Sequence, residues 1–205
     1  MRRQFILLLL TAALSVPVFA ADPHITPEER AKLLKYLKDS QQEFLASLEG
    51  VTDAQWRWKP APEKWSVGET AEHIAIAEGF LFDLSTKAMS SAPDPDWETK
   101  TKGKTEFLER ALLNRNRKVQ APEPLNPGGI TMTRDEVIAK FKAGRAKTIQ
   151  FAETTQLPLR EHITAGPFPV LDPLNAYHFV LYIPLHNLRH DQQIAEVKAT
   201  PGYPK

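Results

Sequence analysis

The residues in this sequence best suited to chemistry are its six histidines. His186 and His190 stand four positions apart, a spacing that places both imidazoles on one face of a helix, where they can share a metal ion. The pair replaces apolar residues on a stripe that the helical period turns toward the core. The apolar members of that stripe are Phe179, Ile183, Ile194 and Val197. The spacing therefore predicts two inward-facing candidate metal ligands.

His73 holds a similar position in an earlier segment, where Ala77 and Phe80 mark an inward-facing stripe. In an antiparallel helix bundle, this histidine can complete a three-nitrogen site with His186 and His190. Three protein ligands leave coordination positions open for water or a substrate, as in catalytic metal sites. The alternative is that all three are core histidines hydrogen-bonded to carbonyl or carboxylate groups, because a buried imidazole needs a partner of some kind.

Two polar side chains stand close to these histidines in the sequence and are candidates to support them. Glu69 precedes His73 by one helical turn and can accept a hydrogen bond from its second ring nitrogen, or it can close a capping box with Ser66. Gln193 follows His190 by three positions. It can orient water or a substrate, or it can hydrogen-bond to the backbone.

Other residues near the candidate site have simpler interpretations. Arg189 points away from the histidine stripe, so we expect it to form a surface salt bridge. Trp56, Trp58 and Trp65 stand in a proline-containing loop before the second predicted helix. They either pack against the end of the bundle or line a pocket that opens there.

The rest of the sequence predicts the helices that must position these side chains. Capping boxes, with Thr or Ser followed three positions later by Glu, open three of the periodic segments. The predicted helices cover residues 26–50, 66–84, 133–152 and 172–199, with a shorter one at 105–120. No stretch alternates with period two for long enough to predict a sheet. We therefore expect an all-α fold, a four-helix bundle with an additional short helix and a long proline-rich connection.

The composition excludes several classes of protein. Apolar residues make up 42% and charged residues 25%, which is typical of a globular domain. The 26 basic and 25 acidic residues argue against a broad basic face for nucleic acid. Cysteine is absent from the sequence, so disulfides, thiolate ligands and a cysteine nucleophile are excluded.

The first twenty residues have the pattern of a secretory signal peptide. Arg2 and Arg3 precede an apolar run over residues 5–14, and small residues around Ala20 suit cleavage there. A run of about ten residues is too short for a stable transmembrane helix, although an uncleaved anchor is the alternative. We therefore expect a signal peptide at 1–20, a helix-bundle domain at 21–205, no stable membrane anchor, and a periplasmic or secreted location.

Two motifs resemble those of one known family. Residues 65–73 read WSVGETAEH and resemble the W-S-x-x-E-x-x-x-H signature of DinB-like metal proteins. Residues 186–194 read HNLRHDQQI and resemble the H-x-x-R-H-x-x-Q-I element near their C-terminus. This is the DNA-damage-inducible helix-bundle family that includes bacillithiol transferases. The resemblance covers most of residues 26–199.

The resemblance implies a four-helix bundle that holds a divalent ion, nickel, zinc or iron, on His73, His186 and His190. Relatives include metal-dependent transferases and isomerases that use small thiols. Two departures stand out. The connection over residues 92–132 is longer than a minimal bundle needs and is placed to cover or reshape the pocket. Export is unusual for a thiol transferase, because the usual thiol cofactors are cytoplasmic.

Two functions follow as hypotheses. The first is an enzyme, a transferase or hydrolase, whose metal activates a thiol or water for attack on a small electrophile. Its partner would be a small-molecule substrate, with a low-molecular-weight thiol among the candidates, supplied from outside because the chain has no cysteine. The second is a metal-binding or stress-related binding protein without turnover. No nucleic-acid partner is expected in either case, and a homodimer is one alternative for its assembly.

The signal motif generates a first prediction. Protein isolated from the cell envelope should begin at Ala21, because cleavage after Ala20 removes the apolar run. Intact-mass measurement of the purified protein checks this. Protein that is soluble in the cytoplasm and retains residues 1–20 would contradict it.

Overall fold

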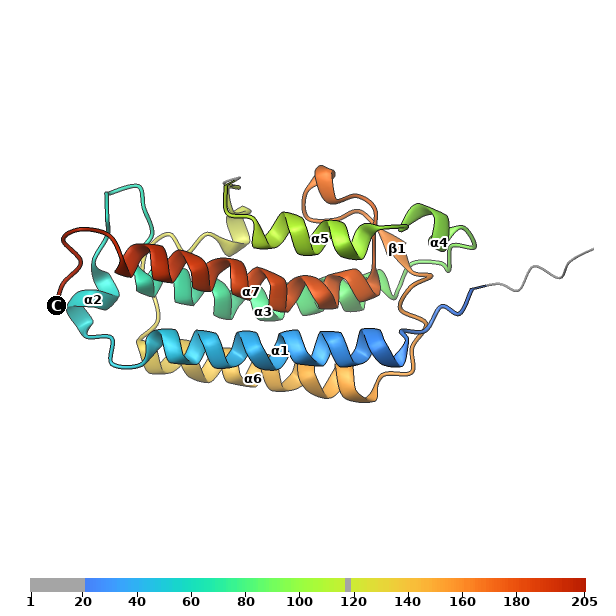
Figure 1. Cartoon of the computed structure of the whole chain (residues 1–205), viewed down its shortest axis with the longest axis horizontal. Coiled ribbons are helices and arrows are strands. Elements are labelled where there is room, and N and C mark those ends of the chain that lie inside the picture. The colour runs from blue at the N-terminus through green and yellow to red at the C-terminus, as the bar shows by residue number, and fades with distance from the viewer. Residues whose placement is uncertain (1–20, 117–118) are drawn as a thin grey trace, which may run out of the picture.

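The computed structural model describes residues 21–116 and 119–205 and is mostly helical (Figure 1). Within this part of the chain, four long helices form a bundle, so the predicted all-α bundle is confirmed. These helices are α1 (Pro27–Leu48), α3 (Val67–Ala88), α6 (Arg134–Thr154) and α7 (Ala176–Lys198). The predicted signal peptide falls on residues 1–20, outside the described residues. No helix among the described residues is long and apolar enough to span a membrane.

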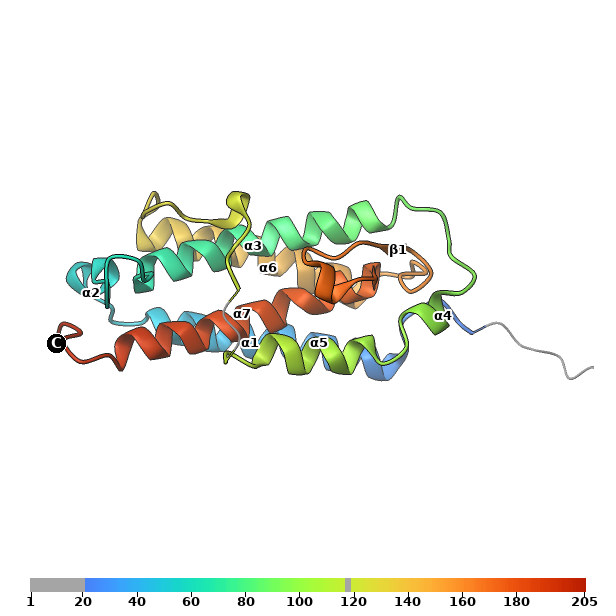
Figure 2. The same ribbon diagram turned by 90° about the horizontal axis from the view of Figure 1, so that it is seen from above.

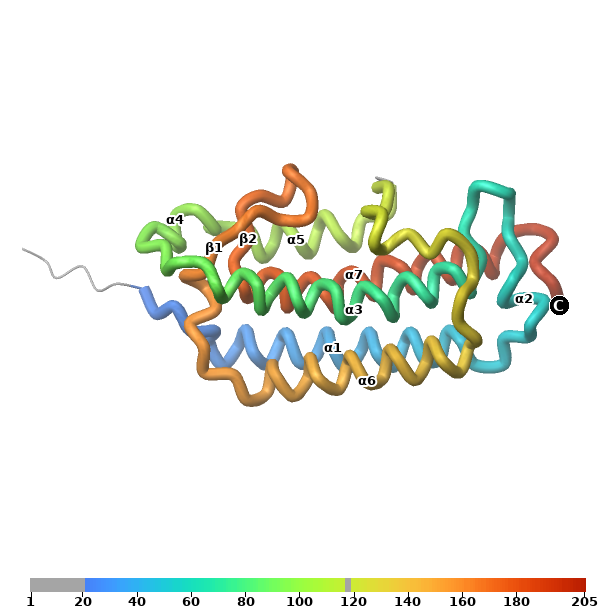
Figure 3. Tube along the Cα trace, turned by 180° about the vertical axis from the view of Figure 1, so that it is seen from behind, coloured from blue at the N-terminus to red at the C-terminus, as the bar shows by residue number. Residues whose placement is uncertain are grey.

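The bundle has two layers, and a third element packs on the outside. The helices α1 and α6 form one layer, and α3 and α7 form the other (Figures 1 and 3). The additional helix α5 (Lys104–Leu113) packs on α7. In the view from above, α7 lies between α3 and α5 (Figure 2). The helix α3 runs antiparallel to α7, and α5 runs parallel to it, since the start of α5 contacts the start of α7 at Thr105 and His178. The helix α7 is therefore surrounded by α1, α3 and α5.

The predicted capping boxes begin the first three long helices. The side chains of Thr26, Ser66 and Thr133 each accept a hydrogen bond from the backbone three residues later. For α7 the predicted start at Asp172 is wrong. The helix begins at Ala176, because the Asn175 side chain caps it by accepting from the His178 backbone.

Short elements make up the connections. The strands β1 (Ile163–Thr164) and β2 (Leu174–Asn175) pair in antiparallel fashion just before α7. The helix α5 ends at Leu113 instead of near residue 120, because Asn114 is extended. Four short helical elements were not predicted from the sequence. They are α2 (Asp53–Arg57), α4 (Trp97–Lys100) and the 3-10 turns η1 (Glu123–Leu125) and η2 (Pro169–Leu171).

A buried arginine joins all four helices at the centre of the bundle. Arg145 of α6 is fully buried and forms a bidentate ion pair with Glu78 of α3, with both N···O distances 2.8 Å. The same guanidinium donates to the Leu37 carbonyl (2.6 Å) and the Ser40 hydroxyl (2.7 Å) of α1. It also donates to the Asn187 side chain of α7 at 3.0 Å. Because a buried charge must be satisfied, this contact set fixes how the helices are rotated and aligned.

The second prediction concerns this arginine. Replacing Arg145 by Met leaves the Glu78 carboxylate buried and unpaired, so the free energy of unfolding should fall by about 3–5 kcal/mol. Urea denaturation of the variant and the wild type measures the difference.

The matched control is the exposed pair of Lys38 on α1 and Glu153 on α6, whose N···O distance is 3.5 Å. Lys38→Met should cost less than about 1 kcal/mol, because solvent screens exposed pairs. Equal losses in the two variants would show that the buried network does not hold the bundle together.

Candidate metal centre

The three histidines predicted to form a site meet between α3 and α7. His73 Nε2 lies 3.1 Å from His186 Nε2 and 3.2 Å from His190 Nε2. Among the described residues, these three side chains form the group of potential ligands that could hold a metal ion. The antiparallel packing of α3 on α7 brings together residues 113 positions apart. The structure thus places all three imidazoles at one point.

Hydrogen bonds at the other ring nitrogens fix the tautomers of two histidines. His73 Nδ1 lies 2.6 Å from the Leu125 carbonyl, which can only accept, so Nδ1 carries the proton. His190 Nδ1 lies 2.9 Å from Gln193 Oε1, an oxygen that also accepts from Arg115 at 3.3 Å. The Nε2 atoms of both rings therefore direct lone pairs at each other. Two lone pairs at this distance repel, and a shared cation removes the repulsion.

The spacing of these nitrogens also suits a metal ion. Zinc binds imidazole nitrogen at about 2.0–2.1 Å. The other two Nε2 atoms lie 3.1 and 3.2 Å from His73 Nε2, less than twice that bond length, and the candidate ligand atoms of all three residues lie within 4.8 Å of one another. The geometry therefore fits one ion held by three imidazoles.

Burial keeps these imidazoles neutral. It lowers the pKa of His73, and it lowers the pKa values of His186 and His190 well below their usual range. The neighbouring imidazoles lower the pKa of His186 further, because each would repel a second positive charge. Neutral imidazole is the form that binds metal, so the site is prepared to bind it near neutral pH.

The two supporting candidates have different positions. Gln193 contacts His190 directly, as described above. Glu69 does not contact His73, since its carboxylate accepts from the Ser66 backbone at 2.8 Å and pairs with Lys59 at 3.0 Å. The capping alternative therefore holds for Glu69, because the helix N-terminus keeps its carboxylate away from the ring.

The connection over residues 92–132 supplies the partner of His73 instead. Glu72, adjacent to His73 and buried, accepts hydrogen bonds from the backbone of Thr131 (2.9 Å) and Met132 (3.1 Å), and from the Thr131 hydroxyl. This anchor holds the end of the connection on α3, near the turn that presents the Leu125 carbonyl. Glu72 was not among the residues predicted for the site, because its only signal in the sequence is an acidic residue on an inward-facing stretch.

Arg189 corrects another expectation. It is buried instead of forming a surface salt bridge, and its guanidinium donates to the carbonyls of Leu112 (3.1 Å) and Asn114 (2.7 Å). These carbonyls are at the C-terminal end of α5, where a positive charge is favourable. Arg189 is buried because α5 covers this face of α7, and helical phase alone predicts that the face is exposed to solvent.

Of the three tryptophans, one lines the pocket and two pack at the end of the bundle. Trp65 lines the site, with its ring centroid 4.9 Å from that of His73 and 6.2 Å from that of His190. Trp56 is buried in the core, and Trp58 packs edge-on against Tyr203 at 5.5 Å. The site wall and the end of the bundle thus share one loop.

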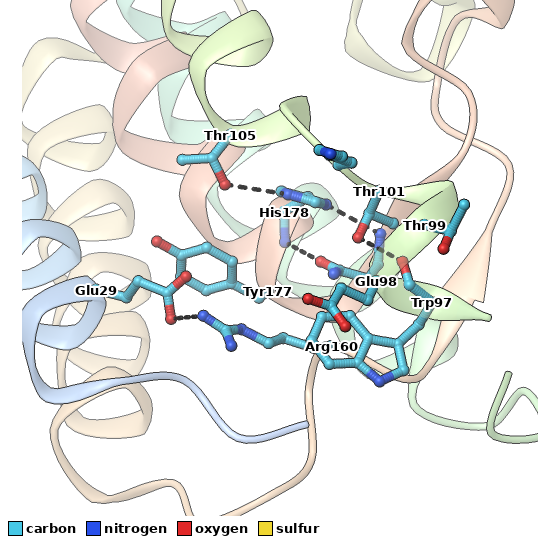
Figure 4. A pocket seen from close by; sticks show the side chains of 11 residues that line it. Glu29, Trp97, Glu98, Thr99, Thr101, Thr105, Arg160, Tyr177 and His178 are labelled. Atoms are coloured by element: carbon cyan, nitrogen blue, oxygen red, sulfur yellow. Dashed lines mark hydrogen bonds and ion pairs between the residues drawn. The ribbon is translucent and has the colours of Figure 1, made fainter. Parts of the chain in front are cut away.

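The three other histidines are engaged elsewhere in the described chain. His24 contacts Asp22, and His162 contacts the Ser91 carbonyl at 2.7 Å. His178 contacts the Thr105 hydroxyl at 3.3 Å in a smaller pocket of about 460 Å³ (Figure 4). In that pocket Arg160 is paired with Glu29.

A larger pocket opens at the three histidines. Its volume is about 970 Å³, at the upper end of the range for small-molecule sites. Helices α3, α5 and α7 contribute to its lining, together with residues 119–126 and 167–171. His73, His186, His190, Trp65 and Gln193 all belong to the lining. A molecule in this pocket can therefore reach the three imidazoles.

Comparison with known proteins gives two matches. The sequence model of the DinB superfamily matches residues 36–194, a range that contains all three histidines. The uncharacterized protein YuaE of Bacillus subtilis (strain 168) is 24% identical over 165 residues, which cover 80% of this chain and 96% of YuaE. No solved structure matches.

The lowered pKa values generate a third prediction, for metal-free protein. His73, His178, His186 and His190 are buried with lowered pKa values, that of His178 to about 3. In the unfolded chain each returns to about 6.5, so below that pH the unfolded state binds more protons. The histidines should make the free energy of unfolding fall below this pH, by up to about 1.4 kcal/mol per pH unit each. Asp191 opposes one of them, because burial raises its pKa to about 8 and its folded form keeps a proton that the unfolded form loses.

Urea denaturation between about pH 7.5 and pH 5 measures this slope. His178→Gln should reduce the slope by about one proton, because it removes one of the four groups. A free energy of unfolding that does not change with pH in this range would contradict the prediction.

Proposed function

This chain belongs to the DinB superfamily, and from that premise we propose that it is an exported metal-dependent enzyme in which His73, His186 and His190 hold one divalent ion. The single observation that carries the proposal is the convergence of three neutral imidazole nitrogens at the wall of a large pocket. Imidazole ligands suit nickel, zinc or iron.

The pocket favours an enzyme over a protein that only stores or senses metal. Three protein ligands leave coordination positions open, which is the arrangement of catalytic sites. The open side faces a pocket of about 970 Å³ that can admit a substrate. A site that holds metal only for stability has no need of such a pocket, and its coordination sphere is usually closed.

The ion, when bound, would lower the pKa of a thiol or of water and so supply a nucleophile near neutral pH. The chain holds the ligands ready for this role. The Leu125 carbonyl and Gln193 orient the rings of His73 and His190, and Trp65 covers one side of the site.

The proposed reaction is a substitution at a small electrophile. The sulfur of a thiol co-substrate, or the oxygen of water, loses its proton and forms a bond to the electrophilic carbon. The bond to the leaving group breaks, and the leaving group departs with the electron pair and takes up a proton from solvent. The chain has no cysteine, so a thiol would come from a co-substrate. In an exported protein, the nucleophile would be water or a thiol present outside the cytoplasm.

Metal binding by histidine variants is the fourth prediction. Wild-type protein titrated with zinc or nickel should bind one ion per chain. Replacing His73, His186 or His190 by Ala should weaken binding by more than the 10- to 100-fold that is typical for loss of a supporting residue. Isothermal titration calorimetry and elemental analysis measure affinity and stoichiometry.

His178→Ala is the control, because His178 is buried on α7 in the other pocket and should leave the stoichiometry at one. Full metal occupancy in His73→Ala would exclude that residue from the site. Assays with thiol-plus-electrophile pairs and with esters then test turnover. A protein that binds one ion tightly and converts none of them would favour the binding-protein alternative.

Gln193 supplies the fifth prediction. Gln193→Leu removes the acceptor for His190 Nδ1 and should weaken metal binding by about 10- to 100-fold. Gln193→Glu retains an acceptor oxygen and should stay close to wild type. Calorimetry of both variants distinguishes loss of the hydrogen bond from loss of side-chain volume. Equal affinity in wild type and Gln193→Leu would show that Gln193 does not support the site.

A further inference from the structure

The pocket at the histidines has two chemically different halves. On α7 its lining follows one stripe that begins at Tyr182, passes His186 and His190, and continues through Gln193 to Val197. From Tyr182 to Val197 the helix rises by about 22 Å along its axis. The histidines lie within this stripe, so the pocket extends from them in both directions.

The half toward the N-terminal end of α7 is lined by aromatic and aliphatic side chains. Phe80 and Leu81 follow His73 on α3, which runs antiparallel to α7, so they lie on the Tyr182 side of the histidines. Phe107 of α5 lies on the same side, because α5 runs parallel to α7 and its first turn contacts the first turn of α7 at Thr105 and His178.

The η2 segment closes this half from outside. Phe168 and Val170 line the pocket, and the Lys104 ammonium donates to the Leu171 carbonyl at 3.1 Å. This contact ties η2 to the first turn of α5. We refer to the volume bounded by Phe80, Leu81, Phe107, Phe168, Val170 and Tyr182 as the apolar half.

The opposite half is polar. Arg115 forms a bidentate pair with Glu196 at 2.8 and 2.9 Å and also donates to Gln193. Lys64 and Thr200 also line this side, next to the apolar side chain of Val197. A charged or strongly polar group suits this half, and hydrocarbon does not.

The mouth of the pocket exposes apolar side chains. Among the described residues, the large apolar side chains most open to solvent are Val119, Val170 and Leu157, at 58%, 57% and 47%. Val119 and Val170 both line this pocket, and Leu157 does not. One exposed apolar residue needs no explanation, but two at the mouth of one pocket indicate an apolar ligand.

We propose that the substrate attacked at this site carries a linear hydrocarbon chain, such as an acyl chain, that occupies the apolar half, with its reactive group at the histidines. From His73 to Leu81 the wall of α3 extends about 12 Å, which suits a chain of medium length better than one small ring. The placement of the reactive group at the histidines rests on the proposed function. The placement of the hydrocarbon chain in the apolar half depends only on the residues that line it.

A homologous series of sodium alkanoates, from acetate to decanoate, tests the proposal. Their carboxylate can bind a metal ion, and their chains sample the apolar half. Calorimetry on zinc-loaded protein should show affinity that rises about 3- to 4-fold per methylene group, until the chain fills the half and the gain stops. Affinity that does not change from acetate to decanoate would overturn the proposal.

Two exposed positions give a matched pair of variants. Val170→Asp places a carboxylate at the mouth of the apolar half and should weaken octanoate binding about tenfold or more, with acetate binding unchanged. Leu157→Asp makes the same change outside the pocket and should change neither. Both residues are exposed, so both variants should fold. Equal octanoate affinity in the two variants would contradict the proposed location of the chain.

Binding of 1-octanol to metal-free protein separates this inference from the proposed function. Octanol lacks a carboxylate, so it should bind without zinc and lose affinity in Val170→Asp. If wild-type protein binds no stoichiometric metal but octanol binds in this way, the metal proposal fails and the apolar half stands. If zinc binds to the three histidines but neither series shows dependence on chain length, the apolar half fails and the metal site stands.

Discussion

The arrangement of this molecule depends on the charge of Arg145 at the centre of the bundle. Its guanidinium is shielded from water and must find all its partners on the three other helices. On α7 that partner is Asn187, which directly follows His186 and precedes His190 by three positions. Satisfying Arg145 therefore sets the rotation of α7 and turns the two histidines toward α3. Glu78 has the same effect on α3, five positions after His73, so one buried ion pair orients both helices that carry the site.

Segments outside the four-helix bundle complete the site. The bundle brings the imidazoles together, but the Leu125 carbonyl that orients His73 comes from the connection outside it. Glu72 fixes one end of that connection on α3, and Arg189 holds the end of α5 on α7. The length of the connection, which looked like an elaboration of a minimal bundle, therefore has a structural purpose. It forms one wall of the pocket and supports one of the proposed ligands.

The helices and the three histidines could be predicted because their signals are local. Capping boxes and apolar stripes depend on residues three or four positions apart, and so does the His186–His190 pair. The Leu125 carbonyl could not be found in this way, because any residue offers a carbonyl and only the fold selects one. Arg189 was misjudged for a related reason, since helical phase shows which way a side chain points but not that α5 lies there. At the start of α7, proline at 173 resembled a first helical position, but the Asn175 cap and the β1–β2 pairing determine where the helix begins.

The separation of His73 from His186 along the chain has a consequence for folding. The two residues are 113 positions apart and meet only after α3 and α7 have packed. Closing so long a loop around an ion in an otherwise unfolded chain carries a large entropic cost. In small zinc domains the ligands are close in sequence, and metal binding drives folding directly. In this protein the order is reversed: the bundle must assemble first, and the ion would enter a site that folding has already built.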